Sequence, residues 1–160
     1  MVLTEAERMG AYTEALRRYT VNTANDVQGR NGAPAVGNEA FQMDLLGAAG
    51  EMAVAAHLHI KHLLYRETKP QRGSYDLPWF DVKTSSRDWG NLIVQLDGPR
   101  EMNYVLVTIE KRQITIRGWA HSSEVMRPEY IADPKGGRRA YFFPQEKLRP
   151  MDTLDYGKSW

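Results

Sequence analysis

The chain has 160 residues and a mass of 18.3 kDa, the usual size of one compact domain. Its composition, 42% hydrophobic and 26% charged, excludes a disordered chain and a fibrous repeat. The formal net charge is +1, with an acidic excess in residues 1–60 and a basic excess in residues 61–160. This distribution permits an anionic partner such as DNA without requiring one, because nucleic-acid-binding modules usually carry a stronger basic excess.

The sequence contains no cysteine, which excludes disulfide bonds, thiolate metal ligands and a cysteine nucleophile. A chain without disulfides fits a reducing compartment. The first residues lack the apolar segment of a secretory signal, and every apolar run is far shorter than the roughly 18 residues that a bilayer-spanning helix needs. We therefore expect a cytoplasmic protein without a membrane segment.

Two helices are predicted in the N-terminal part of the chain. A capping box of Thr4 and Glu7 precedes apolar residues at helical spacing, which predicts a helix over about residues 5–19. Residues 21–38 combine glycine, proline and asparagine and are typical of a mobile loop. Asn38 can cap a second, alanine-rich helix of about five turns. The sequence thus divides into residues 1–38, a helix and flexible loop, and residues 39–160, the core.

After residue 63 the pattern changes to short apolar or alternating runs, which predict strands. The predicted strands are residues 63–67, 79–84, 92–96, 104–111, 113–120 and 139–143. A hairpin turn is expected between Glu110 and Gln113, and Ser122 or Ser123 can cap a short helix that ends near Met126. These elements predict a single α/β domain with a mixed β-sheet flanked by helices.

Asp81 and Lys83 are the first candidate site residues. They alternate with apolar residues along a predicted strand, so both charged side chains should lie on one face of it. An isolated pair of this kind is usually a surface ion pair. Here two further carboxylates precede the pair, namely Asp76 in a polar turn and Glu51 on the second helix.

Glu51 follows the segment Gly47-Ala-Ala-Gly50, and its neighbours at helical spacing are small or apolar. This environment indicates that the helix packs on the sheet and that Glu51 points inward. A buried carboxylate needs a cation or a proton, because an unpaired buried charge costs several kcal/mol or more. A divalent metal ion shared with Asp76 and Asp81 would supply that cation.

In this order the residues resemble the PD-(D/E)xK nuclease superfamily, in which a helical glutamate precedes an aspartate and then an (Asp/Glu)-x-Lys strand. The later segments 104–107, 116–120, 123–125 and 143–151 are similar to small phage-type members of that superfamily. The resemblance implies a restriction-endonuclease-like core and a metal-dependent enzyme that hydrolyses DNA phosphodiester bonds.

The resemblance also implies a role for each residue. Glu51, Asp76 and Asp81 would bind Mg²⁺ or Mn²⁺, and the carbonyl oxygen of Val82 would complete the ligand shell. Lys83 would orient or activate the attacking water and offset charge in the transition state. Hard oxygen ligands suit these ions, which polarise a phosphate and lower the pKa of bound water. Glu67 is the alternative to Asp76 as a ligand, although it lies farther from the motif.

Candidate DNA contacts surround this motif. Polar or basic side chains follow the lysine or precede Asp76: Thr84, Ser85, Arg87 and Arg72. Gln95 could correspond to the glutamine of exonuclease-like branches of the superfamily. The basic group Lys135, Arg138 and Arg139 could contact the DNA backbone. Trp79, Trp89 and Trp119 could stack on unpaired bases, although aromatic residues on strands are more often core residues.

Two other functional classes stay open. A nuclease-fold protein without catalytic activity could bind nucleic acid or a partner protein, but the complete set of acids and the lysine disfavours this. A small structural protein with an accidental motif would bind no metal. For an enzyme, a homodimer would allow a domain of this size to cut both DNA strands. The sequence does not choose between an endonuclease, an exonuclease and a junction resolvase.

Overall fold

The computed structural model describes residues 1–24, 38–59 and 80–155 of the chain. Two long helices, α1 (Glu5–Ala24) and α2 (Asn38–His57), precede the strands. The strands and the third helix are β1 (Phe80–Ser85), β2 (Leu92–Gln95), β3 (Asn103–Glu110), β4 (Gln113–His121), α3 (Ser122–Val125), β5 (Ile131–Ala132) and β6 (Ala140–Phe143). This content confirms the predicted α/β class. Within the described ranges, no helix has the length and apolarity that a membrane crossing requires.

The capping box predicted for α1 is present. The Thr4 amide donates to Glu7 Oε2 at 2.7 Å, and the Glu7 amide donates to Thr4 Oγ1 at 3.2 Å. The helix continues to Ala24, so residues 21–24 are helical and not the start of a loop as predicted. No glycine or proline occurs between the end of the predicted helix and Gly29, which explains the longer helix. The rest of the predicted loop and the predicted strand 63–67 lie outside the described residues.

The first sheet has the strand order β1-β3-β4. β1 and β3 are parallel, whereas β3 and β4 form an antiparallel hairpin, so the sheet is mixed as predicted. The hairpin turn falls at Lys111 and Arg112, whose φ angles of 48° and 64° are both positive. A two-residue turn with both residues in this region matches the right-handed twist of the strands. The predicted turn between Glu110 and Gln113 is therefore confirmed.

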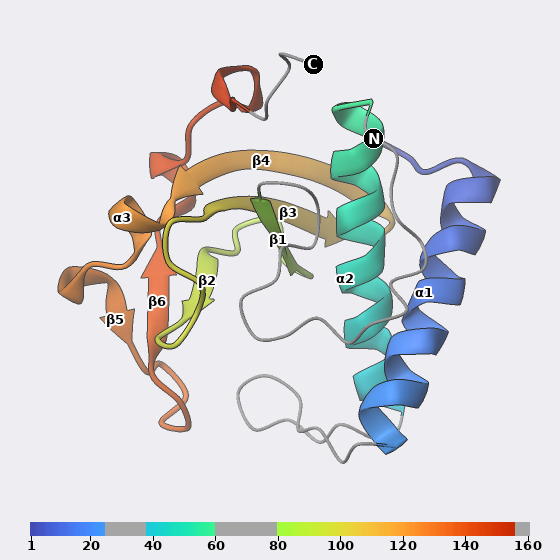
Figure 1. The fold of residues 1–160 in the computed structure, drawn as a ribbon, viewed down its shortest axis with the longest axis horizontal. Helices are drawn as coiled ribbons and strands as arrows, with labels where there is room; N and C mark the ends of the chain where they lie inside the picture. The colour runs from blue at the N-terminus through green and yellow to red at the C-terminus, as the bar shows by residue number, and fades with distance from the viewer. Residues whose placement is uncertain (25–37, 60–79, 156–160) are drawn as a thin grey trace.

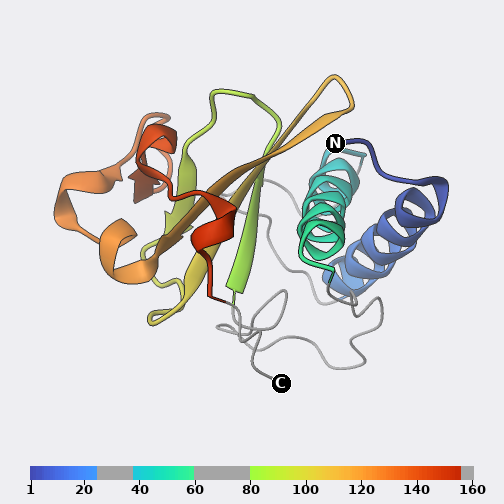
Figure 2. The same ribbon diagram turned by 90° about the horizontal axis from the view of Figure 1, so that it is seen from above.

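A second sheet, with the order β2-β6-β5, is antiparallel. Figure 2 shows the resulting layers: α1 and α2 lie on one side, β1, β3 and β4 in the middle, and β5 and α3 on the other side. One apolar cluster joins α2 to the first sheet, and another joins the two sheets through residues such as Tyr104, Leu106, Leu92 and Phe143. Helices thus cover one face of the mixed sheet, while the second sheet covers the other (Figure 1).

The short helix α3 is capped by His121, which was not predicted as the cap. The Ser123 amide donates to His121 Nδ1 at 3.2 Å, and the His121 amide donates to Glu124 Oε2 at 2.9 Å. The cap is therefore His121, and the prediction of Ser122 or Ser123 was wrong. The imidazole nitrogen accepts the hydrogen bond that a serine hydroxyl would otherwise accept, and Ser122 is instead buried, with its Oγ accepting from the Met102 amide.

Candidate active site

Asp81 and Lys83 lie side by side on β1. Lys83 Nζ is 2.6 Å from Asp81 Oδ2, and the two side chains are only 12% and 7% exposed, respectively. Phe80 and Val82 pack in the cluster beneath α2, so the charged pair faces the opposite side of the strand, as alternation predicted. The pair is not the solvated surface pair that an isolated motif would suggest. It is a largely buried ion pair, whose retention needs a physical reason.

Tyr104 on the neighbouring strand β3 lies beside the Asp81–Lys83 pair. The parallel register places Tyr104 opposite Asp81, and Lys83 Nζ lies 5.8 Å from the centre of the Tyr104 ring. The ring is fully buried, and its hydroxyl donates to the carbonyl oxygen of Pro99. Lys83 Nζ therefore lies between the Asp81 carboxylate and the face of the Tyr104 ring.

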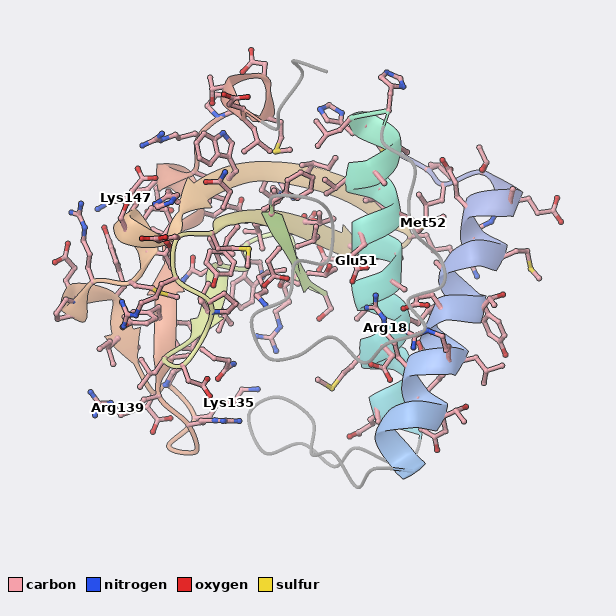
Figure 3. The ribbon with its side chains drawn as sticks, viewed as in Figure 1. Arg18, Glu51, Met52, Lys135, Arg139 and Lys147 are labelled. Carbon is pink, nitrogen blue, oxygen red and sulfur yellow. The ribbon has the colours of Figure 1, made fainter. Side chains whose placement is uncertain are left out.

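Glu51 is buried, with 3% of its surface exposed, as predicted from its apolar neighbours. Arg18 on α1 donates to both of its carboxylate oxygens, at 2.8 Å to Oε1 and 2.7 Å to Oε2 (Figure 3). Arg18 therefore supplies the cation that the sequence analysis assigned to a metal ion alone. The two parallel hydrogen bonds fix the plane of the Glu51 carboxylate.

A second glutamate extends the ion pair along α1. Glu14 is 4% exposed, and it accepts from Arg18 Nε at 2.8 Å and from Arg17 Nε and Nη2, each at 2.8 Å. Burial lowers the pKa of Arg18, but the hydrogen bonds and charges of Glu51 and Glu14 outweigh it and raise this pKa. Burial raises the pKa of Glu14, but the two arginines outweigh it and lower this pKa. The two glutamates and two arginines thus form one connected network of ion pairs.

The backbone of α2 contacts β1 at Gly50, the residue before Glu51. A Cβ atom added to Gly50 would lie 2.1 Å from Thr84 Oγ1, so no larger residue fits without displacement of Thr84. Glu51 therefore follows the residue at which α2 meets β1, whereas Asp81 and Lys83 lie on the opposite face of that strand. Thr84 Oγ1 is buried at the contact with Gly50 and has no hydrogen-bond partner in the described residues.

The remaining predicted ligands are only partly covered by the structure. Asp76 and the alternative ligand Glu67 lie outside the described residues, as does Arg72, which was predicted as a DNA contact. Within residues 1–24, 38–59 and 80–155, no three His, Cys, Asp or Glu side chains are grouped closely enough to hold a metal ion. Glu51 and Asp81 offer buried, ionisable oxygen donors, the chemistry that Mg²⁺ and Mn²⁺ prefer. The structure pairs Asp81 with Lys83 and Glu51 with Arg18.

The candidate DNA contacts have different degrees of exposure. Thr84 presents no hydroxyl to solvent, Ser85 and Gln95 are half-buried, and Arg87 is exposed. The Arg87 guanidinium lies 5.0 Å from the centre of the exposed Trp89 ring. Trp119 is buried, and its indole N–H donates to Pro150 O and Thr153 Oγ1, as a core residue would.

A separate group of basic side chains is exposed in the loop between β5 and β6: Lys135, Arg138 and Arg139. Figure 3 shows Lys135 and Arg139 at the same end of this hairpin, whereas Lys147 lies near the other end of β6. The basic loop is therefore exposed and lies at the opposite end of β6 from Lys147.

Arg18 was not predicted as a site residue. Its signal is the spacing of Glu14, Arg17 and Arg18 on α1, because residues three and four apart face each other on a helix. The contact with Glu51 spans 33 residues of sequence, which no local pattern reveals. No protein-family model, curated protein or solved structure matches the chain.

Proposed function

We propose that the chain is a divalent-metal-dependent nuclease that hydrolyses DNA phosphodiester bonds on a restriction-endonuclease-like core. The observation that supports this proposal most strongly is the largely buried Asp81–Lys83 pair on β1. Burial of two charges carries a desolvation cost that mutual attraction often does not offset, so such a pair is weak evidence for a stabilising role. Perturbed and buried ionisable groups concentrate at functional sites.

The position of Glu51 is the second support. It is a buried carboxylate on the helix whose backbone touches β1 through Gly50 and Thr84. A structural glutamate in an apolar environment would be replaced by a neutral residue at little cost in packing. In this chain Arg18 pairs with the Glu51 carboxylate, and Glu14 in turn holds Arg18 in place.

In the proposed site, Glu51, Asp76, Asp81 and the Val82 carbonyl would hold Mg²⁺ or Mn²⁺. When bound, such an ion polarises the phosphate and lowers the pKa of a bound water. Lys83 holds a fixed positive charge beside Asp81, where it can donate a hydrogen bond to the attacking water or to a phosphate oxygen. Arg18 fixes the orientation of the Glu51 carboxylate through two hydrogen bonds.

A nuclease-fold protein that binds DNA without cutting it is the second candidate. It is favoured by one observation, namely that Arg18 donates to both carboxylate oxygens of Glu51. An arginine that permanently neutralises a ligand reduces its attraction for a metal ion. Metal binding therefore separates the two candidates, because only the enzyme requires Glu51 and Asp81 to act on the same ion.

The proposal is tested by incubation of the purified protein with linear, circular and branched DNA in Mg²⁺, Mn²⁺ or EDTA. We expect cleavage that requires the metal ion. Cutting of circular DNA identifies an endonuclease, degradation of linear DNA alone identifies an exonuclease, and selective cutting of branched DNA identifies a resolvase. A folded protein that cuts none of these substrates with either ion contradicts the proposal.

A further inference from the structure

The loop after β1 presents an exposed tryptophan beside an arginine. Trp89 is 70% exposed, and the Arg87 guanidinium lies 5.0 Å from the centre of its ring. Arg87 follows Lys83 by four residues, so the chain places its Cα atom at most about 14 Å from that of Lys83. A large apolar side chain therefore meets solvent close to the proposed catalytic strand.

This loop is anchored on both sides of Trp89. Asp88 Oδ1 pairs with Arg117 Nη2 at 3.1 Å, and Arg117 Nε donates to the buried Thr108 Oγ1 at 2.8 Å. Gln145 Nε2 donates to the carbonyl oxygens of Asp88 and Gly90, at 2.9 and 2.8 Å. The residues before and after Trp89 are thus fixed to β3, β4 and the segment after β6.

Close packing inside the loop restricts it further. The Arg87 amide donates to Ser85 Oγ at 3.2 Å. A Cβ atom on Gly90 would lie 2.1 Å from the same hydroxyl oxygen, so the turn needs a glycine at this position. A rigid loop that exposes an indole ring is preorganised for binding, because little side-chain and backbone freedom remains to be lost.

We propose that Arg87 and Trp89 form a platform that stacks on an unpaired base, so that DNA with a single-stranded segment is the substrate class. This inference rests on the proposed function for the choice of DNA as the ligand. The indole face accepts any base, while the guanidinium attracts the adjacent phosphate and stacks on the ring. Bases inside a duplex are already stacked on each other, so a blunt duplex offers this platform no comparable contact.

Binding is measured in EDTA by fluorescence anisotropy, with labelled oligothymidylate and a blunt duplex of equal length. We expect Trp89→Ala to weaken oligothymidylate binding about 5- to 150-fold, equivalent to one lost base–aromatic stack of roughly 1–3 kcal/mol. Trp89→Phe should retain most of the affinity, because it keeps an aromatic face. Arg87→Ala should also weaken binding and reduce its salt dependence by about one charge. Arg8→Ala, which removes an exposed charge on α1, is the matched control and should change neither quantity.

Equal affinity of Trp89→Ala and the wild type for oligothymidylate overturns the inference and assigns the platform to another ligand, such as a partner protein. Failure of the wild type to bind oligothymidylate overturns it as well. Cleavage assays with Mg²⁺ separate this result from the proposed function. If the wild type binds through Trp89 but cuts no DNA, the platform stands and the nuclease fails; if Trp89→Ala binds and cuts single-stranded DNA normally, only the platform fails.

Discussion

Arg18 on α1 donates a hydrogen bond to each carboxylate oxygen of Glu51 on α2, and this fork joins the two helices at the proposed site. The arginine side chain is 25% exposed and the glutamate side chain only 4% exposed. Removal of the arginine would leave a buried carboxylate without its bidentate partner. The contact therefore links the two helices and fixes the orientation of the Glu51 carboxylate.

Arg18→Met keeps the length of the side chain but removes its charge. We expect it to lower the free energy of unfolding by about 3 kcal/mol, because it breaks a buried pair from one side. Urea denaturation at neutral pH measures the change. Arg8→Met, at an exposed position on the same helix, is the control and should have little effect. The double variant Arg18→Met/Glu51→Leu should recover part of the loss, and a double variant no more stable than Arg18→Met would contradict the pairing.

Glu14 makes stability depend on pH. Burial raises the pKa of this carboxyl, but the hydrogen bonds and charges of Arg17 and Arg18 prevail and hold it below its usual value of 4.5. Its stabilising contribution is therefore present above pH 4.5 and is lost as the pH falls through the lower value of the folded protein. Glu14→Gln should destabilise the fold by about 2 kcal/mol at pH 7, with a smaller difference from the wild type in acid.

Denaturation of Glu14→Gln and the wild type at a series of pH values measures this difference. Glu5→Gln, in the exposed first turn of α1, is the control. A difference between Glu14→Gln and the wild type that stays constant from pH 7 into acid would show that Glu14 does not titrate with a lowered pKa.

The helices and strands were largely predictable, because periodicity and alternation are local. The alternation of Phe80 and Val82 with Asp81 and Lys83 assigned the correct faces of β1, and the positive φ angles of Lys111 and Arg112 confirm the predicted hairpin turn. The two-residue strand β5 was not predicted, because two residues carry too little pattern. The division of the strands into two sheets was not predicted either, because it depends on contacts between distant parts of the chain.

The site was predictable only in part, because some of its contacts join residues that are far apart in the sequence. Burial of Glu51 followed from its small neighbours, but its partner Arg18 comes from another helix. The sequence interpretation of Thr84 as a phosphate donor used only its place after Lys83. In the structure the residue faces α2, where its hydroxyl meets Gly50. Alternation along β1 already places Thr84 on the same face as Phe80 and Val82, so its direction was predictable, whereas its close contact with Gly50 was not.

The contact between Gly50 and Thr84 predicts that substitutions at the two positions change the free energy of unfolding differently. Gly50→Ala should lower the free energy of unfolding by about 1–2 kcal/mol, because the steric clash exceeds the roughly 1 kcal/mol gain in helix propensity. Thr84→Val removes a buried hydroxyl that has no partner in the described residues, and it should be neutral or stabilising. Thermal and urea denaturation measure both changes.

Two further variants control this experiment. Gly137→Ala adds a methyl group where no heavy atom lies within 4 Å, and it should not destabilise the protein. In Gly50→Ala/Thr84→Ala the nearest clashing oxygen is gone, so most of the lost stability should return. If Gly50→Ala is as stable as the wild type, α2 does not approach β1 as closely as the structure shows.

The rate of Mg²⁺-dependent DNA cleavage by Lys83→Met is the most direct test of the nuclease proposal. Lys111→Met, which removes a lysine at the exposed β3–β4 turn, is the matched control, and circular dichroism below the melting temperature establishes that both variants are folded. We predict a loss of at least about 100-fold for Lys83→Met, the effect of removing a charge that stabilises a transition state, and no loss for Lys111→Met. Cleavage by folded Lys83→Met at the wild-type rate would contradict the assignment of Lys83 to the catalytic site.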